Sequence, residues 1–137
     1  MYRDHRIIKK LDTYIPAAEI FRIYEKELGA AFLDSSLVND LGRYSVIGRC
    51  PYLKLVKDGE TFTINGRPET ETTFEDYMRE YLNTHEDKNN SGLPIVSGAV
   101  GYFSYDYGRK FEQISSRHPK KIQMPEAQFT FFDNYLI

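Results

Sequence analysis

The chain has 137 residues, of which 41% are hydrophobic, 15% are aromatic and 28% are charged, and its formal net charge is −2. This composition is sufficient for one folded core and argues against intrinsic disorder. Acidic and basic residues are mixed, so no stripe of one sign indicates a nucleic-acid or membrane surface. The single cysteine, Cys50, excludes an internal disulfide and a zinc site built on paired thiolates.

The amino terminus does not resemble a secretory signal. Residues 1–6 are charged, no apolar core segment follows them, and no apolar run reaches membrane-spanning length. We therefore expect a cytoplasmic protein that binds neither nucleic acid nor membrane.

The clearest predicted helix lies within residues 10–29. Pro16 suits the first helical turn, where its missing N–H costs nothing, and Gly29 is well placed to end the helix. The apolar residues recur at helical spacing, which predicts one buried face. This face consists of Ala17, Ile20, Phe21, Tyr24 and Leu28.

Several short strands are predicted to follow, at residues 30–36, 43–48, 52–57 and 60–64. Asp58-Gly59 separates the last two, and an Asp-Gly pair between alternating runs favours a hairpin with a type I′ turn. Asn65-Gly66 predicts a further turn. The hairpin implies antiparallel pairing.

A second helix is predicted to begin near Thr73, because Thr73 and Asp76 have the spacing of a capping pair. Its apolar face comprises Phe74, Tyr77, Met78, Tyr81 and Leu82. The later elements expected are a polar loop at 85–92, a strand within 93–104, a short helix at 105–114 and a strand at 127–137.

These elements predict a single α+β domain over residues 1–137, with a mainly antiparallel sheet and two to three helices packed on it. The chain stops inside an apolar, strand-forming run, whereas domains usually finish in a polar tail. We therefore expect it to be part of a longer protein.

No catalytic or metal-binding residue is predicted. All three histidines, His5, His85 and His118, lie in polar surroundings typical of solvated loops. Cys50 has no histidine near it in the sequence, and no glycine-rich phosphate loop is present.

One candidate ligand site follows the first predicted strand. Asp34 and Ser35 close that strand, Gly42 permits a close backbone approach, and Arg43 and Tyr44 come next. Together they offer a carboxylate, a hydroxyl, free backbone groups and a ring, which suit a small zwitterionic ligand. Alternatively, the serine and aspartate satisfy local backbone groups at a strand end.

A second conspicuous segment covers residues 97–112. Gly98 and Gly101 interrupt an apolar strand, which indicates that something large lies against that backbone. Asp106, Arg109 and Glu112 are spaced three apart, as in a ladder of helical ion pairs. On chemistry alone, ordinary strand-to-helix packing with surface ion pairs is the favoured explanation of the segment.

Both segments resemble component I of anthranilate synthase and of aminodeoxychorismate synthase. Leu-Asp-Ser at 33–35 and Gly-Arg-Tyr-Ser-Val-Ile-Gly at 42–48, with Pro51, resemble the Leu-Glu-Ser and Gly-Arg-Tyr-Ser-x-x-Gly of that family. Residues 97–112 resemble Gly-Gly-x-x-Gly-Tyr-x-Ser-Tyr-Asp-x-x-Arg-x-x-Glu, and residues 124–127 begin a stretch similar to Pro-Asp-x-x-Phe. The resemblance runs from about residue 30 to residue 137.

The departures from the family pattern are small. Asp34 replaces a common Glu, and Ser97 replaces the first Gly of the second segment. Gly108, where anthranilate synthases often have Val, and the short spacing between the segments favour the aminodeoxychorismate member.

The resemblance implies a parent enzyme that aminates chorismate to 4-amino-4-deoxychorismate for para-aminobenzoate and folate synthesis. Chorismate, Mg²⁺ and the catalytic residues would belong to a carboxy-terminal domain of the same chain, and a glutamine amidotransferase subunit would supply ammonia. The present chain would be the non-catalytic amino-terminal domain, without a cofactor of its own and inactive alone.

The resemblance also implies a tryptophan pocket at the first segment. The matching positions are Ser35, Leu41, Gly42, Arg43 and Tyr44, with Asp34 adjacent. Two alternatives remain: the amino-terminal domain of an anthranilate synthase component I, in tryptophan biosynthesis, or a free-standing amino-acid-binding module.

Overall fold

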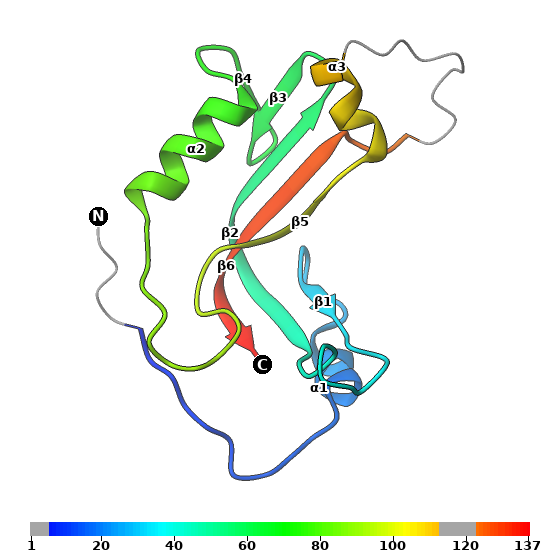
Figure 1. Ribbon diagram of the computed structural model, residues 1–137, viewed down its shortest axis with the longest axis vertical. Coiled ribbons are helices and arrows are strands. Elements are labelled where there is room, and N and C mark those ends of the chain that lie inside the picture. The colour runs from blue at the N-terminus through cyan, green and yellow to red at the C-terminus, as the bar shows by residue number, and fades with distance from the viewer. Residues whose placement is uncertain (1–5, 113–122) are drawn as a thin grey trace.

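A computed structural model describes residues 6–112 and 123–137 and shows a six-stranded sheet flanked by helices (Figure 1). The elements are α1 (Ala17–Tyr24), β1 (Ala31–Leu33), β2 (Val46–Asp58), β3 (Thr61–Ile64), β4 (Arg67–Glu69), α2 (Phe74–Thr84), β5 (Ala99–Phe103), the 3₁₀ helix η1 (Tyr105–Gly108), α3 (Arg109–Glu112) and β6 (Ala127–Leu136). The paired strands are antiparallel and follow the order β4-β3-β2-β6-β5, and β1 pairs with β2. The predicted α+β class is confirmed.

The long strand β2 connects the two ends of the sheet. Its first residues pair with β1, as in Ala31 with Gly48, and its last residues pair with β3. Along its other edge, β6 pairs with it from Ile47 to Lys57. The two strands predicted at 43–48 and 52–57 are therefore one strand, which is interrupted by an irregularity between Pro51 and Leu53. A bulge tolerates a proline, which cannot donate to the ladder.

Both predicted turns form, but the type I′ geometry is found at the second turn and not at the first. Asp58 pairs with Thr61, so Gly59 is the first central residue of the turn, and it alone of the central pair has a positive φ, of 57°. The turn with positive φ at both central residues, as type I′ requires, is Asn65-Gly66, at 50° and 77°. The type I′ expectation at Asp58-Gly59 is wrong because the glycine stands one position earlier in the turn.

The first helix is shorter than predicted. It begins after Pro16, as expected, but ends at Tyr24, and residues 25–30 form turns that lead into β1. Gly29 has a φ of 79° and makes the final change of direction. Leu28 consequently lies outside the helix and is 91% exposed, so its place on the buried face was predicted wrongly.

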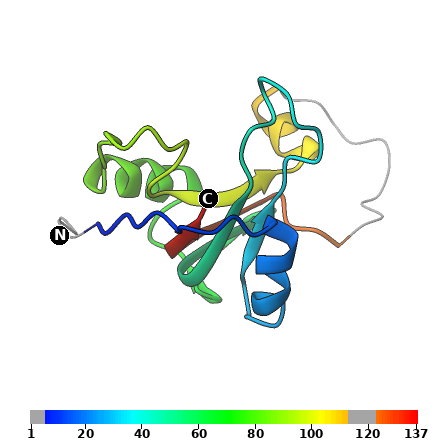
Figure 2. The same ribbon diagram turned by 90° about the horizontal axis from the view of Figure 1, so that it is seen from below.

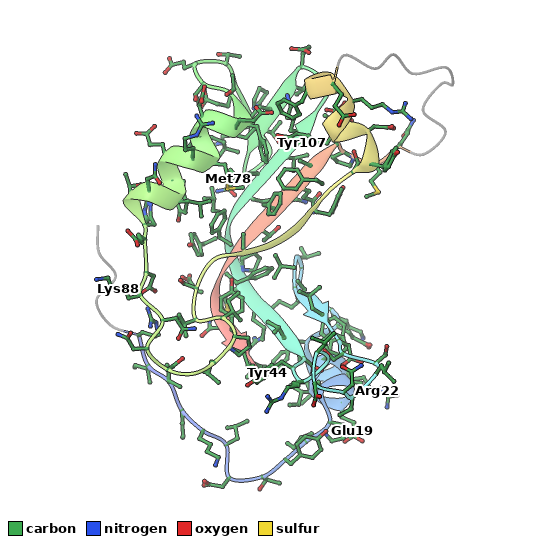
Figure 3. All side chains as sticks on the ribbon, in the orientation of Figure 1. Glu19, Arg22, Tyr44, Met78, Lys88 and Tyr107 are labelled. Atoms are coloured by element: carbon green, nitrogen blue, oxygen red, sulfur yellow. The ribbon has the colours of Figure 1, made fainter. Side chains whose placement is uncertain are left out.

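The main core lies between α2 and the sheet. Thr73 caps α2, since its side chain accepts a hydrogen bond from the Asp76 N–H as predicted. Met78 of α2 and Tyr107 of η1 pack against this core (Figure 3). The buried members of this core are Leu53, Leu55, Phe62, Phe74, Ala127 and Phe131. Leu82, the last residue of the predicted face, is half exposed.

The later elements differ from the sequence prediction mainly in length. The strand expected within 93–104 is β5, which covers Ala99–Phe103. The helix expected at 105–114 is η1 followed by α3, and its predicted end lies outside the described residues. Seen from below, α1 and α2 stand on opposite sides of the strands (Figure 2). Within residues 6–112 and 123–137, no helix has the length and apolarity needed to cross a membrane.

Candidate functional site

The sequence-predicted ligand residues lie on the loop between β1 and β2. At the base of this loop, the Ser45 hydroxyl donates to Asp34 Oδ1 at 2.6 Å, and the Ser35 hydroxyl donates to the Tyr44 carbonyl at 2.6 Å. These two bonds extend the contact between β1 and β2 beyond the last paired residues. The structure therefore brings Asp34, Ser35 and the Tyr44 backbone together.

The outer part of the loop is organised by Asn39. Its side-chain oxygen accepts hydrogen bonds from the N–H groups of Leu41, at 2.8 Å, and Gly42, at 2.7 Å. The Asn39 N–H donates in turn to the Gly42 carbonyl at 3.4 Å. The backbone groups that the sequence offered to a ligand are thus engaged within the loop. The signal that could have indicated Asn39 is the asparagine itself, because its side chain often bonds the backbone two residues further on.

Gly42 allows the loop to approach itself closely. A Cβ atom at this position would lie 2.2 Å from the Leu37 carbonyl oxygen, which no side chain tolerates. The sequence predicted a close backbone approach at this glycine, and the approaching group is the loop's own carbonyl. The space beside Gly42 is therefore filled in this structure.

The remaining predicted side chains are open to solvent. Leu41 is 95% exposed, Arg43 is exposed, and the Tyr44 side chain is 44% exposed at the end of the sheet that carries α1 (Figure 3). Within the described chain, Arg43 makes no ion pair with Asp34, whose carboxylate bonds Ser45 instead. Arg43 and the Tyr44 ring are thus open to solvent, while the Asp34 and Ser35 side chains are engaged in hydrogen bonds at the loop base.

The second conspicuous segment has a packing role in this structure. Arg109 Nε pairs with Asp106 at 3.0 Å, as the spacing predicted, while the expected pair between Arg109 and Glu112 is absent from the described part of the chain. The Tyr107 hydroxyl donates to Glu75 Oε1 at 2.9 Å and links η1 to α2. Burial of this hydroxyl, reinforced by its bond to the Glu75 carboxylate, raises the pKa of Tyr107.

Gly101 also behaves as the sequence predicted. A Cβ atom there would lie 2.1 Å from the Gln128 carbonyl oxygen and 2.7 Å from the Phe129 Cα. The large neighbour inferred at Gly101 is thus the backbone of β6. The same inference is wrong at Gly98, where nothing lies within 4 Å of a Cβ position and where a φ of 118° favours glycine instead.

Sequence reasoning missed a polar cluster between α1 and β2. Glu27 Oε2 accepts from Arg49 Nε at 3.0 Å and from Arg49 Nη2 at 2.7 Å, while Oε1 accepts from the Cys50 N–H at 2.8 Å. The Arg49 guanidinium lies 3.6 Å above the centre of the Tyr24 ring. The Cys50 N–H and then Arg49 lower the pKa of Glu27. No sequence signal joins residues so far apart.

The described residues 6–112 and 123–137 contain no group of three or more His, Cys, Asp or Glu that could hold a metal ion.

Comparison with known proteins places the chain among component I synthase subunits. It is 33% identical to anthranilate synthase component 1 of Saccharomyces cerevisiae over 99% of this chain, and 33% identical to that of Acetivibrio thermocellus over 100% of this chain. It is 26% identical to aminodeoxychorismate synthase component 1 of Escherichia coli over 69% of this chain. No protein-family model matches the sequence.

The fold has a solved counterpart. Anthranilate synthase component I of Streptococcus pneumoniae superimposes on 72% of this chain, and on 22% of its own length, with a TM-score of 0.58 and 23% identity. The chain is thus a component I type of protein in sequence and in fold. It belongs to the family of anthranilate synthase component I and aminodeoxychorismate synthase component I, and it matches the amino-terminal part of those proteins. It spans 27% of the yeast relative's length and 30% of the bacterial one's.

Proposed function

We propose that this chain is the non-catalytic amino-terminal part of a component I subunit that aminates chorismate. The observation that carries the proposal is 33% identity to two component I proteins over 99% and 100% of this chain. The matched part is only 27% and 30% of the length of those proteins. The catalytic acid–base groups and the Mg²⁺ site would then belong to a carboxy-terminal domain. A glutamine amidotransferase subunit would deliver ammonia to it.

Two products are proposed, and each has its own support. Gly108 and the short spacing between the segments at 33–48 and 97–112 favour 4-amino-4-deoxychorismate as the product. The aminodeoxychorismate synthase relatives of Klebsiella aerogenes and Escherichia coli favour it too. The matches that cover 99% and 100% of this chain favour anthranilate. The aminated product itself distinguishes the two.

We further propose that the loop at residues 34–45 contributes one side of a tryptophan site. The Asp34 carboxylate, which bonds the Ser45 hydroxyl at 2.6 Å, can accept a ligand ammonium, and the half-exposed Tyr44 ring can cover an indole. A ligand carboxylate would have to displace Asn39 to reach the Leu41 and Gly42 N–H groups. Because one wall buries little ligand surface, affinity in this chain alone should be about millimolar or weaker.

The decisive experiment reads the gene beyond codon 137 and assays the complete reading frame. The complete protein, with chorismate, Mg²⁺ and ammonia, should release either fluorescent anthranilate or 4-amino-4-deoxychorismate, which a lyase converts to para-aminobenzoate. The 137-residue chain under the same conditions should give no product above a no-protein control. A reading frame that ends at codon 137, together with micromolar tryptophan binding, would support a free-standing binding module instead.

A further inference from the structure

The polar cluster formed by Glu27, Arg49 and the Cys50 N–H joins the turn after α1 to β2 at a point where the backbone is irregular. Cys50 has a φ of 53°, and the β2–β6 register shifts just beyond it. At such an irregularity the ladder leaves backbone N–H groups without an acceptor on the neighbouring strand. Glu27 Oε1 is the acceptor for the Cys50 N–H, at 2.8 Å. The cluster thus satisfies the backbone at the bulge as well as pairing two charges.

Few other contacts hold α1 to the sheet. No residue of α1 is buried, and its ring contact with the sheet is the stacking of Phe21 on Phe32 of β1, with ring centres 4.9 Å apart. Gly29 lies close to Pro51, where an added Cβ would be 3.1 Å from Pro51 Cγ. The Glu27–Arg49 contact is therefore a large share of what fixes α1 and the turn after it.

Both strands that carry the 34–45 loop depart from this cluster. The turn after Glu27 leads through Gly29 into β1, and Arg49 follows directly on the part of β2 that pairs with β1, at Gly48. The loop base then continues that pairing through the Asp34–Ser45 bond. A movement of Glu27 relative to Arg49 is consequently a movement of one loop strand relative to the other.

We infer that Glu27 and Arg49 are positioning residues for the 34–45 loop. They hold β1 in register against β2 and thereby set the relative placement of Asp34, Ser35 and Tyr44. The loop would open locally without this contact, while the core under α2 would remain folded. The consequence for ligand binding rests on the proposed tryptophan site, whereas the positioning of the loop does not.

Amide hydrogen exchange of the 137-residue chain tests this inference. In Glu27→Gln and in Arg49→Gln, the amides of β1 and of the 34–45 loop should exchange about tenfold faster, because a charged hydrogen-bonded contact has been removed from a local opening unit. The amides of Leu53 and Leu55 in the core should not change. The double variant should match either single variant, since both remove the same contact.

The matched control is Arg79→Gln, which removes the exposed Arg79–Asp76 pair of 2.8 Å on α2. It should leave β1 and the loop unchanged. Arg49→Lys retains the cation but not the two-donor contact, so its effect should be intermediate. Unchanged exchange in the loop of Glu27→Gln, or equal acceleration of loop and core amides, would overturn the inference.

Tryptophan titration of the complete reading frame provides the second readout. If the wild-type protein binds tryptophan, Glu27→Gln and Arg49→Gln should weaken that affinity about tenfold, and Arg79→Gln should not. Equal affinity in all variants would overturn the coupling of this contact to the ligand. Absence of binding in the wild type would refute the tryptophan site alone, and the exchange measurement would still decide the positioning role.

Discussion

The α2 half of the sheet and the α1 half are stabilised by different kinds of contact. Under α2, aromatic rings converge on Phe74, which is 2% exposed and packs against Phe62, Tyr107 and Phe129. The α1 half has fewer buried apolar residues, chiefly Ile47 and Phe132, with one stacked ring pair, and beside them it has a charged cluster and loop hydrogen bonds. The α2 half is therefore fixed mainly by burial of rings, whereas the α1 half depends more on directional polar contacts, which open more readily.

The largest expected effect is in the aromatic half. Phe74→Ala should reduce the free energy of unfolding by about 3–5 kcal/mol, because it leaves a cavity among rings that cannot all move inward. Denaturant titration measures this loss. Phe21→Ala, at the stacked pair of the α1 half, is the comparison, and its loss should be clearly smaller. Equal losses would show that the two halves do not differ in the way described.

Gly101→Val should reduce stability by about 1–3 kcal/mol through overpacking. Its Cβ would stand 2.1 Å from the Gln128 carbonyl oxygen, on a strand pair that cannot separate without losing ladder bonds. A thermal melt should show a clear decrease in Tm. Gly108→Ala is the control, because nothing lies within 4 Å of its Cβ position. An unchanged melting curve for Gly101→Val would mean that β5 yields at this point.

Thr73→Ala should cost about 1 kcal/mol, because the first turn of α2 loses its side-chain cap. The change removes no buried ring, so the loss measures the contribution of the helix cap alone and not that of the core beneath α2. Circular dichroism during denaturant titration measures the loss. Thr72→Ala, one residue earlier, should have little effect, and a comparable loss there would contradict the capping role.

The smallest effects concern pH, and two of them arise at Glu27 and at Tyr107. The pKa of Glu27 is lowered, so its stabilising contribution is present above the ordinary value of 4.5 and is lost as the pH falls through the lowered value. The pKa of Tyr107 is raised, so its contribution is present below the ordinary value of 10.0 and is lost only as the pH rises through the raised one.

Acid should therefore loosen α1 and β1 first, and alkali should loosen the contact between η1 and α2. Nuclear magnetic resonance at both extremes of pH measures the two responses residue by residue. Glu27→Gln should abolish the acid response at the Glu27–Arg49 contact, and Tyr107→Phe should abolish the alkaline response at the contact between η1 and α2. Burial also raises the pKa of Tyr77 and of Tyr135, so their surroundings should respond to alkali in both variants. An unchanged response at either contact in its variant would refute the assignment.

The sequence predicted those features that arise from local patterns. The cap at Thr73, the apolar face of α2 from Phe74 to Tyr81 and the hairpin pairing after Asp58 depend on neighbours within a few residues, and these were confirmed, although Leu82 and the type I′ turn were not. The turn that follows α1 was not predicted, and the contacts that Glu27 makes there are with Arg49 and Cys50, far along the chain at the β2 bulge, where no local pattern can indicate them.

The candidate site shows the same limit. Its residues could be selected from the motif, and the close approach at Gly42 could be expected, but not the group that fills the space beside it. The role of Asn39 depends on the path of the loop, which residue spacing does not determine. Whether Asp34, Ser35, Leu41, Gly42, Arg43 and Tyr44 bind tryptophan stays a prediction.

The pairing of β2 with β6 has a consequence for the order in which the chain folds. Ile47 of β2 lies opposite Leu136, almost at the other end of the chain, whereas β3 and β4 follow β2 through tight turns. During synthesis, the β2–β3–β4 meander can form early, because its contacts are local. The apolar residues of β2 must wait until residues 127–136 have emerged from the ribosome. Throughout that interval β2 offers an unpaired edge, and this makes it the strand most exposed to mispairing with other nascent chains.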